Sequence, residues 1–173
     1  MLPAIDRLNA MPDGDAAATL GAFFENAPGF VRRVCRERPF SSYEQLIERA
    51  EEMAATLPED EQLEVINGHP RIGAEPSSVS AQSYREQGYD RVAQPGEDGL
   101  AERLAQLNAE YERRFGFRFC IFVAGRPRSE VADIMSSRLN AQREEELARA
   151  LSDVFAIARS RLVKLSQPLE EVR

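Results

Sequence analysis

The chain has 173 residues, a length that suits one domain with a substantial core, and its 43% apolar and 29% charged residues are ordinary for a globular protein. Its net charge of −7 and sequence pI of about 4.9 argue against nucleic acid or an anionic membrane as partner, because both attract basic surfaces. A small anionic substrate is still compatible with this charge, since one arginine in a pocket can outweigh a distant negative surface.

No run approaches the ~18 apolar residues of a membrane span, and residues 1–6 lack the basic and apolar segments of a secretory signal. The two cysteines, Cys35 and Cys120, lie among apolar residues without a CxxC pattern, which indicates buried free thiols in a reducing compartment. We therefore expect a cytoplasmic protein. One histidine and two distant cysteines also disfavour a metal site.

Helical periodicity dominates the first half of the chain. The apolar spacing predicts four helices there, over residues 16–24, 28–36, 43–57 and 58–68. Ser41 or Ser42 can cap the third, because Glu44 and Gln45 stand three residues on, as in a capping box. Pro28 suits the first turn of the second helix.

The second half alternates helices with loops rich in glycine and proline, over 69–78 and 88–99. The predicted helices cover residues 80–87, 100–115, 130–139 and 145–165. The only β-like run begins at Phe117, and one such run cannot form a sheet alone, so we interpret 117–124 as an extended buried segment. The prediction is an all-α, compact single domain over 1–173, a bundle of about eight helices.

The one histidine, His69, stands between Gly68 and Pro70. Histidine is the default proton-transfer group near neutral pH. The residue before a proline is pushed out of the α region, which holds the ring in a set direction. Considered by itself, the loop favours a simpler role, on the surface or bonded to a nearby carbonyl.

A polar face is predicted on the helix over 80–87. Ser83, Glu86 and Gln87 fall at i, i+3 and i+4, so their side chains leave the same face. A carboxylate, an amide and a hydroxyl together can bind a polar, nitrogen-rich ligand. A solvated helix face is the simpler interpretation of this pattern alone.

Two further features can contact a ligand. The extended segment 117–124 leaves backbone groups that need partners, which a ligand, or equally loops and turns, can supply. Arg161 lies beside the apolar residues Ile157 and Leu162 on the last helix and can reach inward. An arginine near a helix C-terminus is also simply favourable for the helix dipole.

In order and spacing, these pieces resemble one family, the decarboxylases of 2-oxo-4-hydroxy-4-carboxy-5-ureidoimidazoline (OHCU) in urate breakdown. The resemblance rests on the segments LNAMP (8–12), FFENAP (23–28), RPF (38–40), GHPRIG (68–73), SxxEQ (83–87), LNxxYxxxFGFxF (107–119) and the helix pair over 138–162. A departure is Gly29, where family members often carry tryptophan.

The resemblance implies an all-helical enzyme without a cofactor or metal, usually a homodimer, that converts OHCU to (S)-allantoin. It implies catalytic roles for His69 and Glu86. The substrate-binding residues that it implies are Pro70, Ser83, Gln87, the backbone of Cys120, Ile121, Phe122, Val123 and Ala124, and Arg161. Two alternatives stay open: a non-catalytic relative that binds a ligand, and an enzyme of the same fold acting on a related ureido compound.

Overall fold

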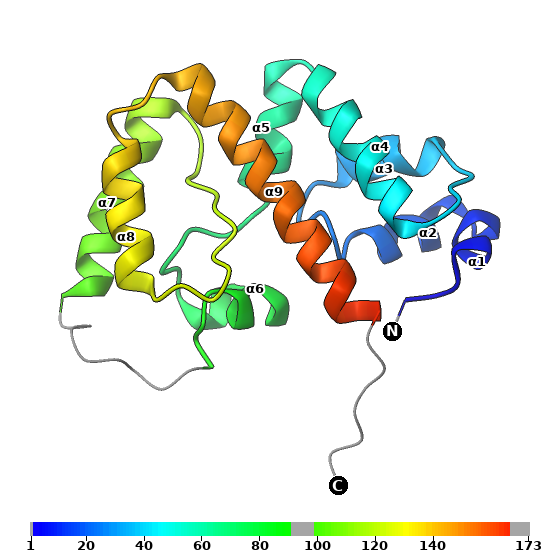
Figure 1. The fold of residues 1–173 in the computed structure, drawn as a ribbon, viewed down its shortest axis with the longest axis horizontal. Helices are drawn as coiled ribbons and strands as arrows, with labels where there is room; N and C mark the ends of the chain where they lie inside the picture. The colour runs from blue at the N-terminus through cyan, green and yellow to red at the C-terminus, as the bar shows by residue number, and fades with distance from the viewer. Residues whose placement is uncertain (1, 91–98, 167–173) are drawn as a thin grey trace, which may run out of the picture. The chain divides into compact units, whose positions relative to one another are not determined.

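The computed structural model describes residues 2–90 and 99–166, and over these ranges it is built of helices and loops without a β-strand (Figure 1). The all-α prediction is confirmed. None of the helices in these ranges is long and apolar enough to cross a membrane. Most of the predicted loop 88–99, at 91–98, lies outside the described residues.

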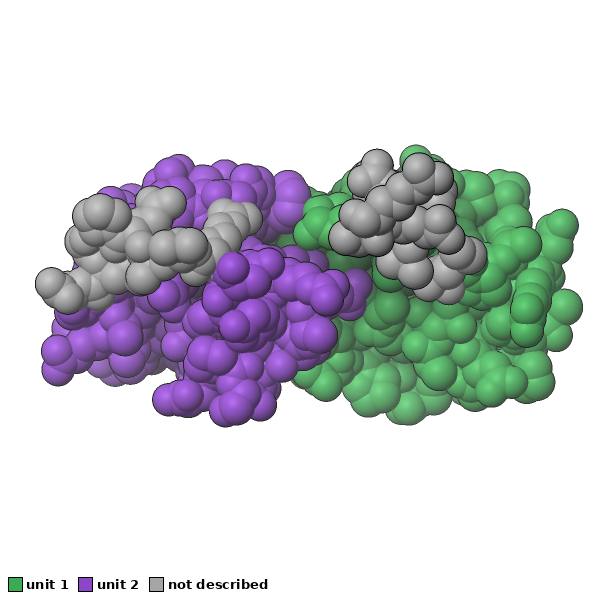
Figure 2. Space-filling model, turned by 90° about the horizontal axis from the view of Figure 1, so that it is seen from below, with its two compact units in different colours: residues 1–68, 151–173 green, residues 69–150 purple. Residues whose placement is uncertain are grey.

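The chain forms two compact units, coloured separately in Figure 2. Unit 1 combines residues 1–68 with those from 151 onward, and unit 2 comprises 69–150. The divisions fall between Gly68 and His69 and within the last helix.

In the part of unit 1 that the structure describes there are five helices and the second part of α9 (Arg143–Ser166). The five helices are α1 (Ile5–Ala10), α2 (Asp13–Leu20), α3 (Pro28–Arg36), α4 (Tyr43–Thr56) and α5 (Glu59–Asn67). The core holds Phe24, whose ring meets Phe30 and Phe155 edge to face with centroids 5.1 and 5.7 Å away. Such pairs add to the stabilisation from burial.

Two helix boundaries in unit 1 correct the sequence prediction. The predicted helix over 16–24 begins three residues earlier, at Asp13, and ends at Leu20. Phe23 and Phe24 are therefore buried from the turn after α2 and not from a helix. The short helix α1 was not predicted, because it buries only Leu8 and so shows no apolar periodicity. The cap by Ser42 is confirmed, because Gln45 N donates to Ser42 Oγ at 3.1 Å. The returning bond is shifted by one residue from a capping box, since Gln45 Oε1 accepts from Ser41 N at 2.6 Å and not from Ser42 N.

The turn between α2 and α3 packs closely against the end of α5. A Cβ placed on Gly68 would lie 2.1 Å from the carbonyl oxygen of Glu25, so only glycine fits there. Asn26 has a positive φ of 49° and donates from Nδ2 to the Gly68 oxygen at 3.1 Å. One turn earlier in α5, Glu64 Oε1 accepts from Gly29 N at 2.7 Å. These contacts fix where α5 ends.

The described residues of unit 2 form a 3-10 turn, three further helices and the start of α9. They are η1 (Pro76–Ser78), α6 (Ala81–Glu86), α7 (Leu100–Phe115) and α8 (Arg128–Arg138). Helices α7 and α8 lie side by side in Figure 1. The left-handed Gly116, with φ of 82°, ends α7 as the sequence predicts.

The segment after α7 is extended and largely buried, as predicted. Tyr111 packs against Phe115, Phe117 and Phe119 with centroids 4.5 to 5.8 Å apart. Its hydroxyl donates to Glu146 Oε2 at 2.7 Å, and burial followed by this bond raises the pKa of the Tyr111 hydroxyl, which therefore stays protonated. This hydroxyl is a constant donor to a fully buried carboxylate that also pairs with Arg149.

We expect Gly68→Ala to destabilise the protein by more than about 2 kcal/mol, because the added methyl group collides with the Glu25 carbonyl. Gly14→Ala is the matched control: it lies in α2, where an added Cβ would have nothing within 4 Å, and should be neutral or stabilising by up to about 1 kcal/mol. Urea unfolding of both variants measures the difference. Equal stability of the two would contradict the close packing of this turn.

Tyr111→Phe should cost about 1–3 kcal/mol, because it removes a donor from the buried Glu146 carboxylate. Tyr84→Phe serves as the comparison, since its hydroxyl donates at 3.1 Å to the Tyr89 carbonyl at a partly buried position that water can reach. Thermal unfolding should give a clearly larger drop in Tm for Tyr111→Phe, and a smaller or equal drop would refute the role given to this pair.

Candidate functional site

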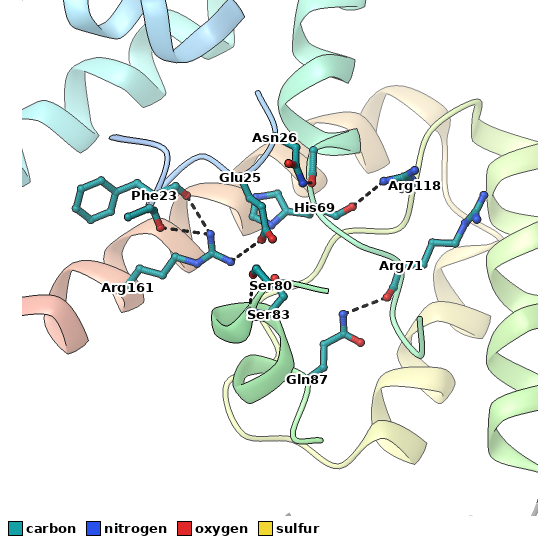
Figure 3. A network of polar contacts seen from close by, with 12 residues as sticks. Phe23, Glu25, Asn26, His69, Arg71, Ser80, Ser83, Gln87, Arg118 and Arg161 are labelled. Carbon is teal, nitrogen blue, oxygen red and sulfur yellow. Dashed lines mark hydrogen bonds and ion pairs between the residues drawn. The ribbon is translucent and has the colours of Figure 1, made fainter. Parts of the chain in front are cut away.

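His69 follows the last residue of unit 1 and is buried, with 5% of its surface exposed. The surface location that the loop alone favoured is therefore wrong. Its carbonyl oxygen accepts a hydrogen bond from Arg118 Nη1 at 3.2 Å (Figure 3). Burial removes the imidazole from bulk water, which suits a group that transfers protons to a bound molecule.

Side chains make hydrogen bonds to both carbonyl and N–H groups in the backbone of the loop that follows His69. Gln87 donates from Nε2 to the Arg71 oxygen at 3.1 Å, and its Oε1 accepts from Gly73 N at 3.0 Å. Asn108 donates from Nδ2 to the Ile72 oxygen at 2.9 Å. The loop is irregular in conformation, yet these polar backbone groups have partners.

Helix α6 presents the predicted polar residues with different exposures. Ser80 caps the helix, its Oγ accepting from Ser83 N at 3.1 Å. Ser83 and Gln87 are buried, whereas Glu86 is partly exposed. A wholly solvated helix face is therefore wrong for this helix. Gln87 is its C-cap, and its amide already makes two bonds to the loop, which leaves one N–H and one lone pair for other partners.

The segment from Cys120 to Ala124 leads into a tight turn. Cys120, Ile121 and Val123 are buried, Phe122 is partly exposed and Ala124 is exposed. Ala124 has a positive φ of 51°, a conformation that a non-glycine residue seldom adopts. Arg126 donates from its backbone to the Val123 oxygen at 3.0 Å and from Nη2 to the Phe122 oxygen at 2.7 Å.

Two bonds drawn as dashed lines in Figure 3, from Arg118 to His69 and from Gln87 to Arg71, join three segments of unit 2. These are the histidine loop, the end of α6 and the start of the extended segment. Pro70 lies between the two bonded loop residues. The structure thus brings together, within one unit, the segments that carry nearly all of the predicted site residues.

Arg161 belongs to unit 1 and is 1% exposed. Its Nη2 lies 3.1 Å from Glu25 Oε2, and its Nη1 lies 3.5 Å from the carbonyl oxygens of Ala22 and Phe23 (Figure 3). Helix α9 continues to Ser166, so Arg161 is not at its C-terminus. Because its side chain is also buried, the arginine points into the unit and does not merely cap the helix end. A buried guanidinium needs such a carboxylate partner.

The sequence did not single out four residues that make long-range contacts to these segments, namely Glu25, Asn26, Asn108 and Arg118. Glu25 and Asn26 fall inside the segment over 23–28 that carries the family resemblance, and Asn108 and Arg118 inside that over 107–119, but no contact to the site was predicted for them. Periodicity locates faces, not long-range partners, so it could not have found these contacts.

The described residues contain no group of three or more histidine, cysteine, aspartate or glutamate side chains arranged to hold a metal ion. The groups that the histidine loop and α6 offer are an imidazole, a carboxyl group, an amide and backbone amides. Such groups can transfer a proton and bind a compound rich in N–H and C=O groups.

Comparisons with known proteins give a consistent result. The model of the OHCU decarboxylase family matches residues 9–163. The uric acid degradation bifunctional protein PucL of Bacillus subtilis (strain 168) is 32% identical over 161 residues, which are 93% of this chain and 32% of that protein. The OHCU decarboxylase of Mus musculus is 32% identical over 162 residues, covering 92% of this chain and 90% of the mouse protein. This chain thus spans about a third of the length of the bifunctional relatives.

Two solved structures share the fold. A crystal structure of OHCU decarboxylase in the presence of (S)-allantoin superposes with a TM-score of 0.68 at 22% identity, covering 90% of this chain and 98% of that one. A crystal structure of (S)-allantoin synthase gives 0.69 at 21% identity, covering 94% of this chain and 54% of that one. With a family match across most of the sequence and a mouse relative of nearly equal extent, the chain belongs to the OHCU decarboxylase family.

Proposed function

We propose that this protein is a carboxy-lyase that decarboxylates OHCU to (S)-allantoin in urate catabolism, without a cofactor. The observation that carries the proposal is the family match over 9–163, which includes the only histidine of the chain, itself buried, on a hydrogen-bonded loop. An imidazole in that setting is suited to the proton transfer that the reaction requires.

The reaction breaks the bond between C4 of the ring and its carboxylate. The electron pair moves toward the adjoining ring imine, whose nitrogen takes up a proton, and CO2 leaves. The C4 hydroxyl then loses its proton to become the carbonyl, while the ureido-bearing C5 takes up a proton on one face. His69 is the general acid–base group near the C4 hydroxyl and the developing carbanion. Positioned proton transfer of this kind is typically worth about 10²–10⁴-fold in rate.

The remaining proposed residues bind and orient the substrate. Glu86 and Gln87 accept from N–H groups of the ring and of the ureido arm, with Ser83 beside them on α6 and Pro70 next to the histidine. Backbone groups over 120–124 and the Arg161 guanidinium bind substrate oxygens. Holding the ring in one orientation decides which face of C5 is protonated.

We also propose that residues 1–173 act as one functional domain, because the family match extends across both compact units. By the same resemblance the protein works as a homodimer in the cytoplasm on a small-molecule substrate. Size-exclusion chromatography with light scattering tests the dimer.

His69→Asn should lower the decarboxylation rate by about 10² or more, because it removes the group that transfers the proton. Freshly generated OHCU is added, and circular dichroism follows the formation of (S)-allantoin. Far-UV spectra and Tm should match the wild type, which separates loss of chemistry from loss of fold. An unchanged enzymatic rate would refute the role of His69. Binding of (S)-allantoin by a wild-type protein that never turns over OHCU would favour the non-catalytic alternative.

Glu86→Gln should lower kcat/KM for OHCU by about tenfold or more, since a neutral amide accepts N–H bonds less strongly than a carboxylate does. Glu110→Gln, on the exposed face of α7, is the control with the same chemical change and should keep wild-type kinetics. Steady-state measurements on the two variants compare them directly. If Glu86→Gln behaves like the control, Glu86 has no part in the site.

A further inference from the structure

Side chains from distant parts of the sequence donate hydrogen bonds to four backbone carbonyl oxygens between Gly68 and Ile72. The bonds are Asn26 to Gly68 at 3.1 Å, Arg118 to His69 at 3.2 Å, Gln87 to Arg71 at 3.1 Å and Asn108 to Ile72 at 2.9 Å. A loop has no repeating ladder of its own bonds, so its conformation depends on such partners. The donors are therefore what determines the conformation of this backbone.

Two of these bonds are made to the peptide groups on either side of His69. The Gly68 carbonyl belongs to the peptide group before His69, and the His69 carbonyl belongs to the peptide group after it. Because each peptide group is planar, the two backbone dihedrals of His69 depend on how these planes are held, the first by Asn26 within unit 1 and the second by Arg118 within unit 2, and these dihedrals set the direction of its Cα–Cβ bond. The following Pro70 narrows the same dihedrals further.

We propose that Asn26 and Arg118 are positioning residues for His69, one acting within unit 1 on the peptide before the histidine and the other within unit 2 on the peptide after it. The inference rests on the proposed function, because the orientation of the imidazole ring matters only if His69 transfers a proton. Neither residue belongs to the proposed catalytic or binding set.

Asn26 combines two properties that its position requires. Its φ of 49° lies in the left-handed region, which asparagine and glycine tolerate better than other residues. Its amide supplies the donor for Gly68, which has no Cβ because the Glu25 carbonyl approaches it so closely. Glycine at position 26 would keep the turn and lose only the donor, so Asn26→Gly isolates the hydrogen bond.

Arg118 is partly exposed, whereas its aromatic neighbours Phe117 and Phe119 are buried. Its guanidinium also lowers the pKa of the Glu112 carboxyl, after the larger effect of the Arg71 bond. Arg118→Met keeps the length and the aliphatic part of the side chain and removes the donor. The aromatic core beneath the segment is left intact.

The control is Asn9→Ala. Asn9 makes the same kind of contact elsewhere in unit 1: its Nδ2 donates to the Phe40 oxygen at 2.8 Å, and its Oδ1 accepts from Phe40 N at 2.9 Å. It ties backbone segments that are far apart in sequence but makes no bond to the histidine loop. It should lower Tm at least as much as Asn26→Gly, because it removes two bonds instead of one.

The kinetic test compares kcat and KM for OHCU in the three variants. Asn26→Gly and Arg118→Met should each lower kcat by about tenfold, the size of one lost hydrogen bond at a site that needs accurate placement, with KM within about twofold of wild type. Asn9→Ala should keep wild-type kcat. A kcat that stays at the wild-type value in both positioning variants, or that falls equally in the control, would overturn the proposal.

The second test needs no turnover. Since the chain has one histidine, ¹³Cε1-histidine labelling gives a single imidazole resonance that reports on His69 alone. We expect Asn26→Gly and Arg118→Met to shift, broaden or split this resonance in the ligand-free protein, and Asn9→Ala to leave it unchanged. Wild-type spectra in both positioning variants would contradict the inference. If the wild type fails to decarboxylate OHCU, the proposed function fails, and these spectra still decide whether the two residues hold the histidine.

Discussion

The structure around the histidine depends on one constraint: polar backbone groups that leave a helix and enter a partly buried loop must find new partners. Helix α5 ends at Asn67, and the chain that follows directly has no strand or helix to satisfy its carbonyls. Side chains supply the bonds instead. The donors come from separate segments of the chain. Asn26 bonds to Gly68 within unit 1. Within unit 2, the residues that follow Gly68 accept bonds from Gln87, Asn108 and Arg118.

The buried arginine shows how an acidic protein can hold a positive group in its interior. Arg161 is almost wholly buried and forms an ion pair with Glu25. The backbone of Glu25 also packs on Gly68. A guanidinium held between a carboxylate and two main-chain carbonyls is oriented before any ligand arrives. The net charge of −7 is thus no obstacle to binding an anion, because local geometry outweighs the distant surface.

Much of the secondary structure was predictable where a local signal marks the boundary. Helix α3 spans the predicted residues because Pro28 starts it, and α7 does so because Gly116 ends it in a left-handed conformation. The prediction failed where no local signal exists. The end of α2 at Leu20 was missed because apolar residues continue through the turn that follows, where the core and not helical periodicity requires them.

By itself the sequence determined the all-α class, the buried segment after α7 and the presence of a single histidine as the one candidate for proton transfer by an imidazole. These follow from short-range patterns, from the residue count and from motifs in a recognisable order. Only the tertiary structure decided that His69 is buried and that the amide of Gln87 bonds to the histidine loop. It also decided that Asn26 and Arg118 bond to the peptide groups before and after His69. The physical reason is that these hydrogen bonds join residues far apart in the chain, and their partners exist only once the helices have packed.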